Sequence, residues 1–236
     1  CIFNYCAMKK YIFRPDFLIA TRKWLTILPL CLFCFLAQAQ QLRVNVIKAG
    51  TLSEKVGENK KFQTTSLTVS GTLNSSDLRF LREMAGITAD GKPTAGQLKN
   101  LDLKKARFVT GGEPYITNGA HGLYVQTGTA IDRYLFAYTH LESFVFPEKT
   151  DSIRAFAFAH SGLKQIKLPE NVMLFEGAFQ NDSLLTSVIF PQNTRSFSKS
   201  VFDNCSLLKQ LSLNNVKYFS AYGISNMNEP TNITFN

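Results

Sequence analysis

The chain has 236 residues, with 26 Lys and Arg against 17 Asp and Glu, so its formal charge at neutral pH is +9. Hydrophobic residues make up 45% of the sequence and charged residues 18%, which excludes a wholly disordered chain, and five cysteines exclude a dense disulfide scaffold. The basic charge would fit nucleic acid or an anionic membrane as a partner, but only if the basic residues belong to the folded part.

Residues 1–39 have the pattern of a secretory signal peptide. Met8 opens a basic stretch, Trp24–Leu36 is a run of thirteen largely apolar residues, and Ala37-Gln38-Ala39 fits the small-x-small cleavage pattern. The apolar run is shorter than the ~20 residues that cross a bilayer. We therefore expect cleavage after Ala39, an exported protein, and no membrane span in the mature chain. Residues 1–7 would lie upstream of the natural start.

Cys31 and Cys34 lie in the apolar run and raise the alternative of a lipid-anchored protein. Leu30 and Phe33 precede them, and both are bulky where lipid attachment needs a small residue, so a cleaved signal is preferred. Cleavage would leave 21 basic and 16 acidic residues, a charge of +5, and Cys205 as the single cysteine. Such a protein has no internal disulfide and depends on packing for its stability.

Residues 40–109 are expected to form an N-terminal β-α-β cap. Ser66–Ser70 is a strand candidate, and Ser75 or Ser76 can cap a helix that ends before the next glycine. The apolar spacing in Leu98–Leu103 predicts a further strand. A unit of this kind would shield one end of a repeat array.

Residues 110–130 form a glycine-rich insertion. The glycines are Gly111, Gly112, Gly119, Gly122 and Gly128. They lack the Lys-Ser/Thr pair and the following helix of a phosphate-binding loop, so a flexible or irregular loop is the preferred interpretation.

A pattern of about 22 residues recurs from residue 131 to residue 236. Each copy contains a segment of the type Leu-x-x-Leu-x-Leu, and the final apolar residues of these segments are 22, 22, 23 and 22 positions apart, at Phe146, Leu168, Phe190, Leu213 and Phe235. A second marker keeps the same period, at Phe136, Phe158, Phe179 and Phe202. Two markers with one period indicate a structural repeat.

The repeat predicts an α/β solenoid. Apolar residues two positions apart indicate a short strand, and the proline that follows three of the strands ends the backbone ladder. Stacked copies would align these strands into a parallel β-sheet on one face, with short or irregular loop or helix segments on the other. Of the 15 Phe after residue 39, 12 follow residue 130, so we interpret the Phe residues as core filling.

The segment Leu163–Pro191 resembles the BspA-like leucine-rich repeat. Ala157-Phe158 and Ala178-Phe179 match its Ala-Phe pair, and Cys205 stands where the family has its cysteine. The same position of the other copies is assigned to Tyr138, His160 and Asp182. The resemblance implies a secreted or cell-surface protein, adhesin-like, that binds host or bacterial surface proteins.

No catalytic motif is recognisable in the sequence, and we expect no enzyme activity and no cofactor. His121, His140 and His160 lack zinc-ligand spacing, and one cysteine cannot complete a cluster, so no metal site is expected. Cys205 is interpreted as a packing residue. An enzyme with its site in the 110–130 insertion is the least favoured alternative.

Nucleic acid is not an expected partner. Lys104, Lys105 and Arg107 form the tightest basic group, but no stripe of alternating basic and aromatic residues accompanies them. We interpret these charges as a solvated face.

The candidate partner-binding face is the outer side of the repeat strands, since solenoids commonly bind there. Its residues are Ser143, Val145, Gln165, Lys167, Ser187, Ile189, Gln210 and Ser212, with Asn232 and Thr234 in the last strand. Two alternatives stay open. The face can be a solvated surface without a partner, or the chain can be a spacer in a larger surface protein, since Asn236 follows a strand directly and the array would be truncated.

Overall fold

The structure, a computed structural model, describes residues 40–213, 220 and 232–235. The predicted signal peptide therefore lies outside the described residues. The compact unit that contains the described residues begins at Gln40.

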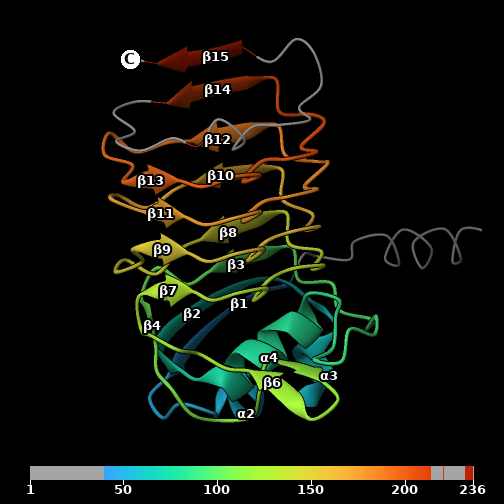
Figure 1. Ribbon diagram of the computed structural model, residues 1–236. Coiled ribbons are helices and arrows are strands. Elements are labelled where there is room, and N and C mark those ends of the chain that lie inside the picture. The colour runs from blue at the N-terminus through green and yellow to red at the C-terminus, as the bar shows by residue number, and fades with distance from the viewer. Residues whose placement is uncertain (1–39, 214–219, 221–231, 236) are drawn as a thin grey trace, which may run out of the picture. The chain divides into compact units, whose positions relative to one another are not determined.

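The N-terminal segment begins with two long parallel strands joined by short helices. Strand β1 (Gln40–Val46) pairs in parallel with β2 (Thr64–Leu73), and α2 (Leu52–Val56) and α3 (Glu58–Lys61) lie between them in the chain. Helix α4 (Ser75–Met84) follows β2 and packs on the sheet (Figure 1). The strand predicted at 66–70 is thus part of a longer element, and β1, α2 and α3 were not predicted.

Asn74, rather than Ser75 or Ser76, caps helix α4. The Asn74 side chain accepts hydrogen bonds from the backbone N–H groups of Ser76 and Asp77, and the Asp77 carboxylate accepts one from the N–H of Asn74. Asp77 also accepts from the N–H of Gly50 and Leu52, at 2.6 and 2.9 Å. This capping box therefore ties the start of α4 to the chain that enters α2.

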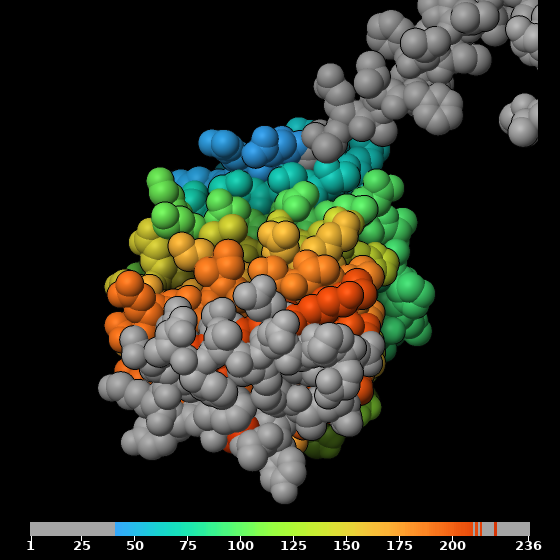
Figure 2. Space-filling view, turned by 90° about the horizontal axis from the view of Figure 1, so that it is seen from above, coloured from blue at the N-terminus to red at the C-terminus, as the bar shows by residue number. Residues whose placement is uncertain are grey.

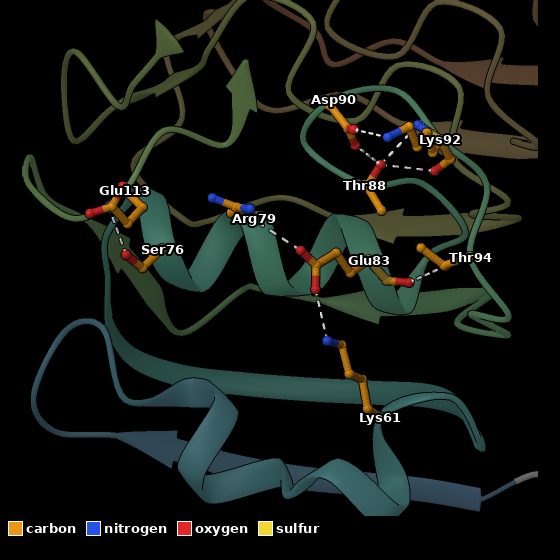
Figure 3. A network of polar contacts seen from close by, with 9 residues as sticks. All are labelled: Lys61, Ser76, Arg79, Glu83, Thr88, Asp90, Lys92, Thr94 and Glu113. Atoms are coloured by element: carbon orange, nitrogen blue, oxygen red, sulfur yellow. Dashed lines mark hydrogen bonds and ion pairs between the residues drawn. The ribbon is translucent and has the colours of Figure 1, made fainter.

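A polar network fixes the exposed side of α4 (Figure 3). Glu83 forms ion pairs with Lys61 at 2.7 Å and with Arg79 at 3.5 Å. The hydroxyl of Thr94 donates to the backbone carbonyl of Glu83 at 2.6 Å. The loop after α4 is thereby fastened to the end of the helix.

Short parallel strands follow one another in a first column (Figure 1). They are β3 (Asn100–Asp102), β8 (Ser143–Val145), β10 (Gln165–Lys167), β12 (Ser187–Ile189), β14 (Gln210–Leu213) and β15 (Asn232–Phe235). Strand β3 pairs with both β2 and β8, β10 pairs with β12, and β14 pairs with β15, all in parallel. The sequence prediction of parallel repeat strands is confirmed. Strand β4 (Ala106–Phe108) extends the pairing along the end of β2.

A second column of strands lies across the core from the first. Its members are two residues long and pair in parallel in the order β13 (Ser196–Phe197), β11 (Met173–Leu174), β9 (Ser152–Ile153) and β7 (Ala130–Ile131). The sequence predicts loop or helix segments here, and no α-helix follows Met84 in the described residues. Strands form here instead because each copy points one apolar residue of this segment into the core. The backbones of successive copies are thereby aligned and pair with one another.

Stacked phenylalanine rings fill the space between the columns. Phe136, Phe158, Phe179 and Phe202 are all fully buried, and successive ring centroids are 5.6, 5.4 and 5.4 Å apart. The interpretation of these residues as core filling is confirmed. The colour bands of Figure 2 show the copies stacked in chain order.

The 110–130 insertion, predicted to be a flexible or irregular loop, contains a β-hairpin in its middle, whereas residues 110–115 and 124–129 have no regular secondary structure. Strands β5 (Ile116–Asn118) and β6 (His121–Leu123) pair antiparallel around a two-residue turn. Gly119 in that turn has φ of 59°, which glycine adopts without strain. A Cβ at Gly122 would lie 2.7 Å from a side-chain carbon of Pro114, so this glycine allows a close approach of the chain.

Candidate binding surface

The outward side chains of the first strand column form two rows. In the first row, the register aligns Gln41 with Ser66, Ser66 with Asn100, and Asn100 with Ser143. The Ser143 hydroxyl donates to the Asn100 side-chain oxygen at 2.8 Å. Gln165 and Ser187 are aligned in the same way on β10 and β12. This row therefore presents amides and hydroxyls only, and we call it the polar row.

The second row carries the charges and the apolar groups. Arg43, Thr68, Asp102 and Val145 are aligned across β1, β2, β3 and β8, and Lys167 is aligned with Ile189 on β10 and β12. Val145 is 44% exposed and Ile189 is 52% exposed. Two apolar side chains at the surface, with Lys167 on the intervening strand, make this mixed row the part best suited to a protein contact.

Six of the eight residues predicted for this face are placed by the structure on its outward side. Ser143, Val145, Gln165, Lys167, Ser187 and Ile189 alternate with the buried Phe144, Ile166 and Val188. For Gln210 and Ser212 the backbone is described in β14, but their side chains lie outside the described part.

The sequence analysis did not predict that the N-terminal strands β1, β2 and β3 also form part of this surface. Arg43, Thr68, Asp102 and Lys104 line one depression, and Lys104 also lines a second one with Val145 and Lys167. The alternation in Leu42-Arg43-Val44-Asn45-Val46 is the signal that could have revealed β1, since every second residue is apolar.

An ion network lies at the amino-terminal edge of the first column. Glu142 pairs with Lys99, at 2.7 Å, and with Lys164. The hydrogen bond from Lys164, followed by that from Lys99, holds the pKa of Glu142 below its ordinary value. The two ion pairs of Glu142 therefore link three successive layers of the first column.

The assignment of Tyr138 and His160 to the family's cysteine position is wrong. Both have left-handed backbones, with φ of 61° and 58°, as do Asn181 and Asn204 at the matching places. The N–H of His160 donates to the carbonyl of Gln180, and that of Asn181 to the carbonyl of Asp203, which sets the alignment. Four positions separate the left-handed residue from the next strand Leu in the copies of Asn181 and Asn204, but only three in the copies of Tyr138 and His160. Counting back from Leu therefore displaced the two earlier assignments by one.

Outward side chains at these left-handed positions form an edge row. The rings of Tyr138 and His160 stack with centroids 4.6 Å apart, and the Asn181 amide lies 3.1 Å from Nε2 of His160. Asn204 donates to the side-chain oxygen of Asn181 at 2.9 Å. His160 therefore contacts the layers on both sides of it at the edge of the solenoid, through Tyr138 and Asn181.

The residues that share the position of Cys205 are Thr139, Ser161 and Asp182, all buried. The Cys205 thiol donates to the carbonyl of Phe179 at 3.1 Å, and burial, followed by the nearby Asp182, raises its pKa. A buried thiol with a raised pKa is a poor nucleophile, which agrees with a packing role.

The described residues contain no group of three or more His, Cys, Asp or Glu side chains that could hold a metal ion. Within the same part of the chain, no helix is long and apolar enough to cross a membrane.

Comparison with protein families decides the nature of the second half of the chain. Residues 129–236 match the model of the BspA type leucine rich repeat region, in six copies. This part of the chain is a BspA-type leucine-rich repeat region. The strands from β7 onward that make up the two columns lie within the matched residues. The comparison with curated proteins gave no match.

Two solved chains are similar to this protein. One is a leucine-rich repeat protein from Bacteroides ovatus, with 18% sequence identity and a TM-score of 0.43. The match covers 82% of this chain but only 45% of the solved chain, so this chain spans less than half of that protein's length.

Proposed function

We propose that this protein is exported and binds another protein through the mixed row of its BspA-type sheet face, as an adhesin-like molecule at or beyond the cell surface. The observation that carries the proposal is the exposure of Val145 and Ile189 on the strands to either side of Lys167. The inward side chain of each of these three strands is buried. Apolar groups at the centre of a patch with polar surroundings are typical of protein interfaces.

We propose the domain organisation that the sequence predicts. Residues 1–39 would be the signal, 40–109 an N-terminal cap, 110–130 an insertion and 131–236 the repeats. Support for export comes from the chain itself: the compact unit begins at Gln40, directly after the predicted cleavage site. Support for a cap comes from α4, whose own side chains Leu81 and Met84 are buried in the same core cluster as the strands.

Charge introduced on the mixed row is the direct test. The substitution Ile189→Glu, alone and with Val145→Glu, places a carboxylate in the centre of the proposed contact. Surface proteins retained by the native protein would be identified by mass spectrometry, and the affinity of each purified candidate would then be measured. We expect at least a tenfold loss of affinity, since a carboxylate in an apolar contact is left unpaired.

The matched control is Phe175→Glu. Phe175 is exposed to a similar extent but follows β11 in the second column, away from the mixed row. A partner lost equally with Phe175→Glu, or bound undiminished by the Ile189 and Val145 variants, would rule out the sheet face as the binding site.

A further inference from the structure

A pocket lies where the insertion meets the first repeat turn. It has a volume of about 310 Å³, and its wall is formed by the loop after α4, by β5, and by the turn that contains Tyr134 and Tyr138. Arg82 of α4 and Asn118 at the end of β5 are among the lining residues. The volume is at the lower end of the range for small-molecule sites, so one sugar-sized ligand would fit.

The walls of this pocket are held by hydrogen bonds on each side. The backbone N–H of Thr117 donates to the carbonyl of Ala89 at 2.8 Å, which joins the hairpin to the loop. That loop is closed by Thr88, whose hydroxyl contacts Asp90 and the carbonyl of Lys92 (Figure 3). The pocket is therefore largely preformed, which reduces the entropy lost on binding.

Arg82 is a buried cation without a carboxylate partner in the described residues. The residue is 2% exposed, and Nη1 donates to the carbonyls of Tyr134 and Leu135 at 2.9 and 2.6 Å. Nε has no hydrogen-bond partner. Burial lowers the pKa of Arg82 to about 10. Because a desolvated cation is costly unless it is paired, an anion that reached it would be held firmly.

The carboxylate in the pocket lining, that of Asp90, is already engaged. Asp90 forms an ion pair with Lys92 at 2.8 Å, and the hydrogen bonds from Lys92 and Thr88 lower the pKa of Asp90 to about 2. The charge of Asp90 is thus directed to Lys92 on the outer side of the loop. This leaves Arg82 as the cation that a ligand would meet.

The remaining lining groups suit a sugar ring. Tyr138 is 54% exposed, and stacking on His160 holds its ring in place. A fixed aromatic face can pack against the apolar face of a sugar ring, while the side chains of Thr117 and Asn118 offer hydrogen-bonding groups for its hydroxyls.

We propose that this pocket binds a hexuronate, with the sugar carboxylate directed to Arg82 and the sugar ring packed on Tyr138. The site is separate from the sheet face and does not depend on the proposed protein partner. It gives the 110–130 hairpin a role, since that hairpin supplies one wall.

Two sugars that differ in one group provide the test. Methyl β-D-glucuronide carries a carboxylate where methyl β-D-glucoside carries a hydroxymethyl group. Each is titrated into the purified protein by calorimetry and by NMR. We expect saturable binding of the glucuronide with a Kd of about 1 mM and at least tenfold weaker binding of the glucoside. Equal binding of the two sugars, or no saturation by the glucuronide at about 20 mM, would overturn the proposal.

Substitutions of exposed pocket residues test the site without removing a buried side chain, so the variants should fold. Tyr138→Ala and Asn118→Ala change exposed side chains in the pocket and are each expected to weaken glucuronide binding at least fivefold. Tyr124→Ala is the matched control, since Tyr124 is an exposed tyrosine outside the pocket lining, and it should bind as the native protein does. Undiminished binding by both pocket variants would place the sugar elsewhere and refute the assignment.

Discussion

Asp182 is an ionisable side chain in a buried row whose other members are Thr139, Ser161 and Cys205. Its Oδ1 accepts a hydrogen bond from the N–H of Ser161 at 2.6 Å, whereas Oδ2 has no partner. Burial raises the pKa of Asp182 well above its ordinary value. The folded state therefore holds a proton on Asp182 at pH values where the unfolded chain has lost it.

This proton gives a pH dependence of defined sign. Because the pKa of Asp182 is raised on folding, its contribution is most favourable below about pH 4, and stability falls as the pH rises above that value. Asp182→Asn keeps the oxygen acceptor and removes the titration. Relative to this variant, we expect the free energy of unfolding of the native protein to fall as the pH rises from 4 to 8, as measured by urea unfolding.

Glu170→Gln is the control for this comparison, since Glu170 is exposed, and its pH profile should follow that of the native protein. A pH profile for Asp182→Asn that runs parallel to the native one would show that Asp182 does not titrate in this range.

At the scale of elements, a strand can be predicted when its residues show a recognisable pattern, whereas a very short strand cannot. The strands β8, β10 and β12 follow from the alternation of apolar residues, and the same alternation identifies which of their side chains face outward. The two-residue strands of the second column are too short to have a period. The insertion was interpreted as a loop because its glycines mark turns, although one of those turns closes a hairpin.

Helix α4 shows why a cap is hard to locate from sequence. Asn74, Ser75 and Ser76 are all favourable cap residues, and the choice depends on where β2 ends, at Leu73. Ser75 and Ser76 instead accept hydrogen bonds from Val125 and Glu113, at the two ends of the hairpin segment. Neither long-range contact has a local sequence signal.

Asn74→Ala should therefore destabilise the protein by about 1 kcal/mol, because it removes the acceptor for two N–H groups of the first helical turn. The measurement is urea unfolding, with the exposed loop residue change Asn193→Ala as the control. Ser76→Ala should have the smaller effect, since it loses one exposed bond to Glu113. A larger loss for Ser76→Ala than for Asn74→Ala would restore Ser76 as the cap.

At the scale of the whole molecule, the 22-residue period predicts the repeat half, but it does not extend to the N-terminal strands. The outward residues Arg43, Thr68 and Asp102 come from strands separated by helices and by loops of unequal length. Their alignment with Val145 is set by the strand order β1-β2-β3-β8, which only the folded chain reveals. The candidate binding face is consequently longer than the one predicted from the repeats alone.

The start of the folded unit at Gln40 leads to a prediction about processing. If Ala39 is the last residue of the signal, the exported protein should begin at Gln40, the first residue of β1. Ala39→Leu places a bulky side chain in a position where the peptidase requires a small one, and should leave most of the protein unprocessed. N-terminal sequencing and intact mass of the exported protein provide the measurement.

Gln38→Asn is the control for this substitution, because the middle position of the small-x-small pattern tolerates polar residues, and it should be processed normally. An exported protein that retains residues before Gln40, or normal processing of Ala39→Leu, would contradict this cleavage site. Cleavage after Ala39 would leave β1 complete, since the pairing of β1 with β2 in the described residues begins at Gln40.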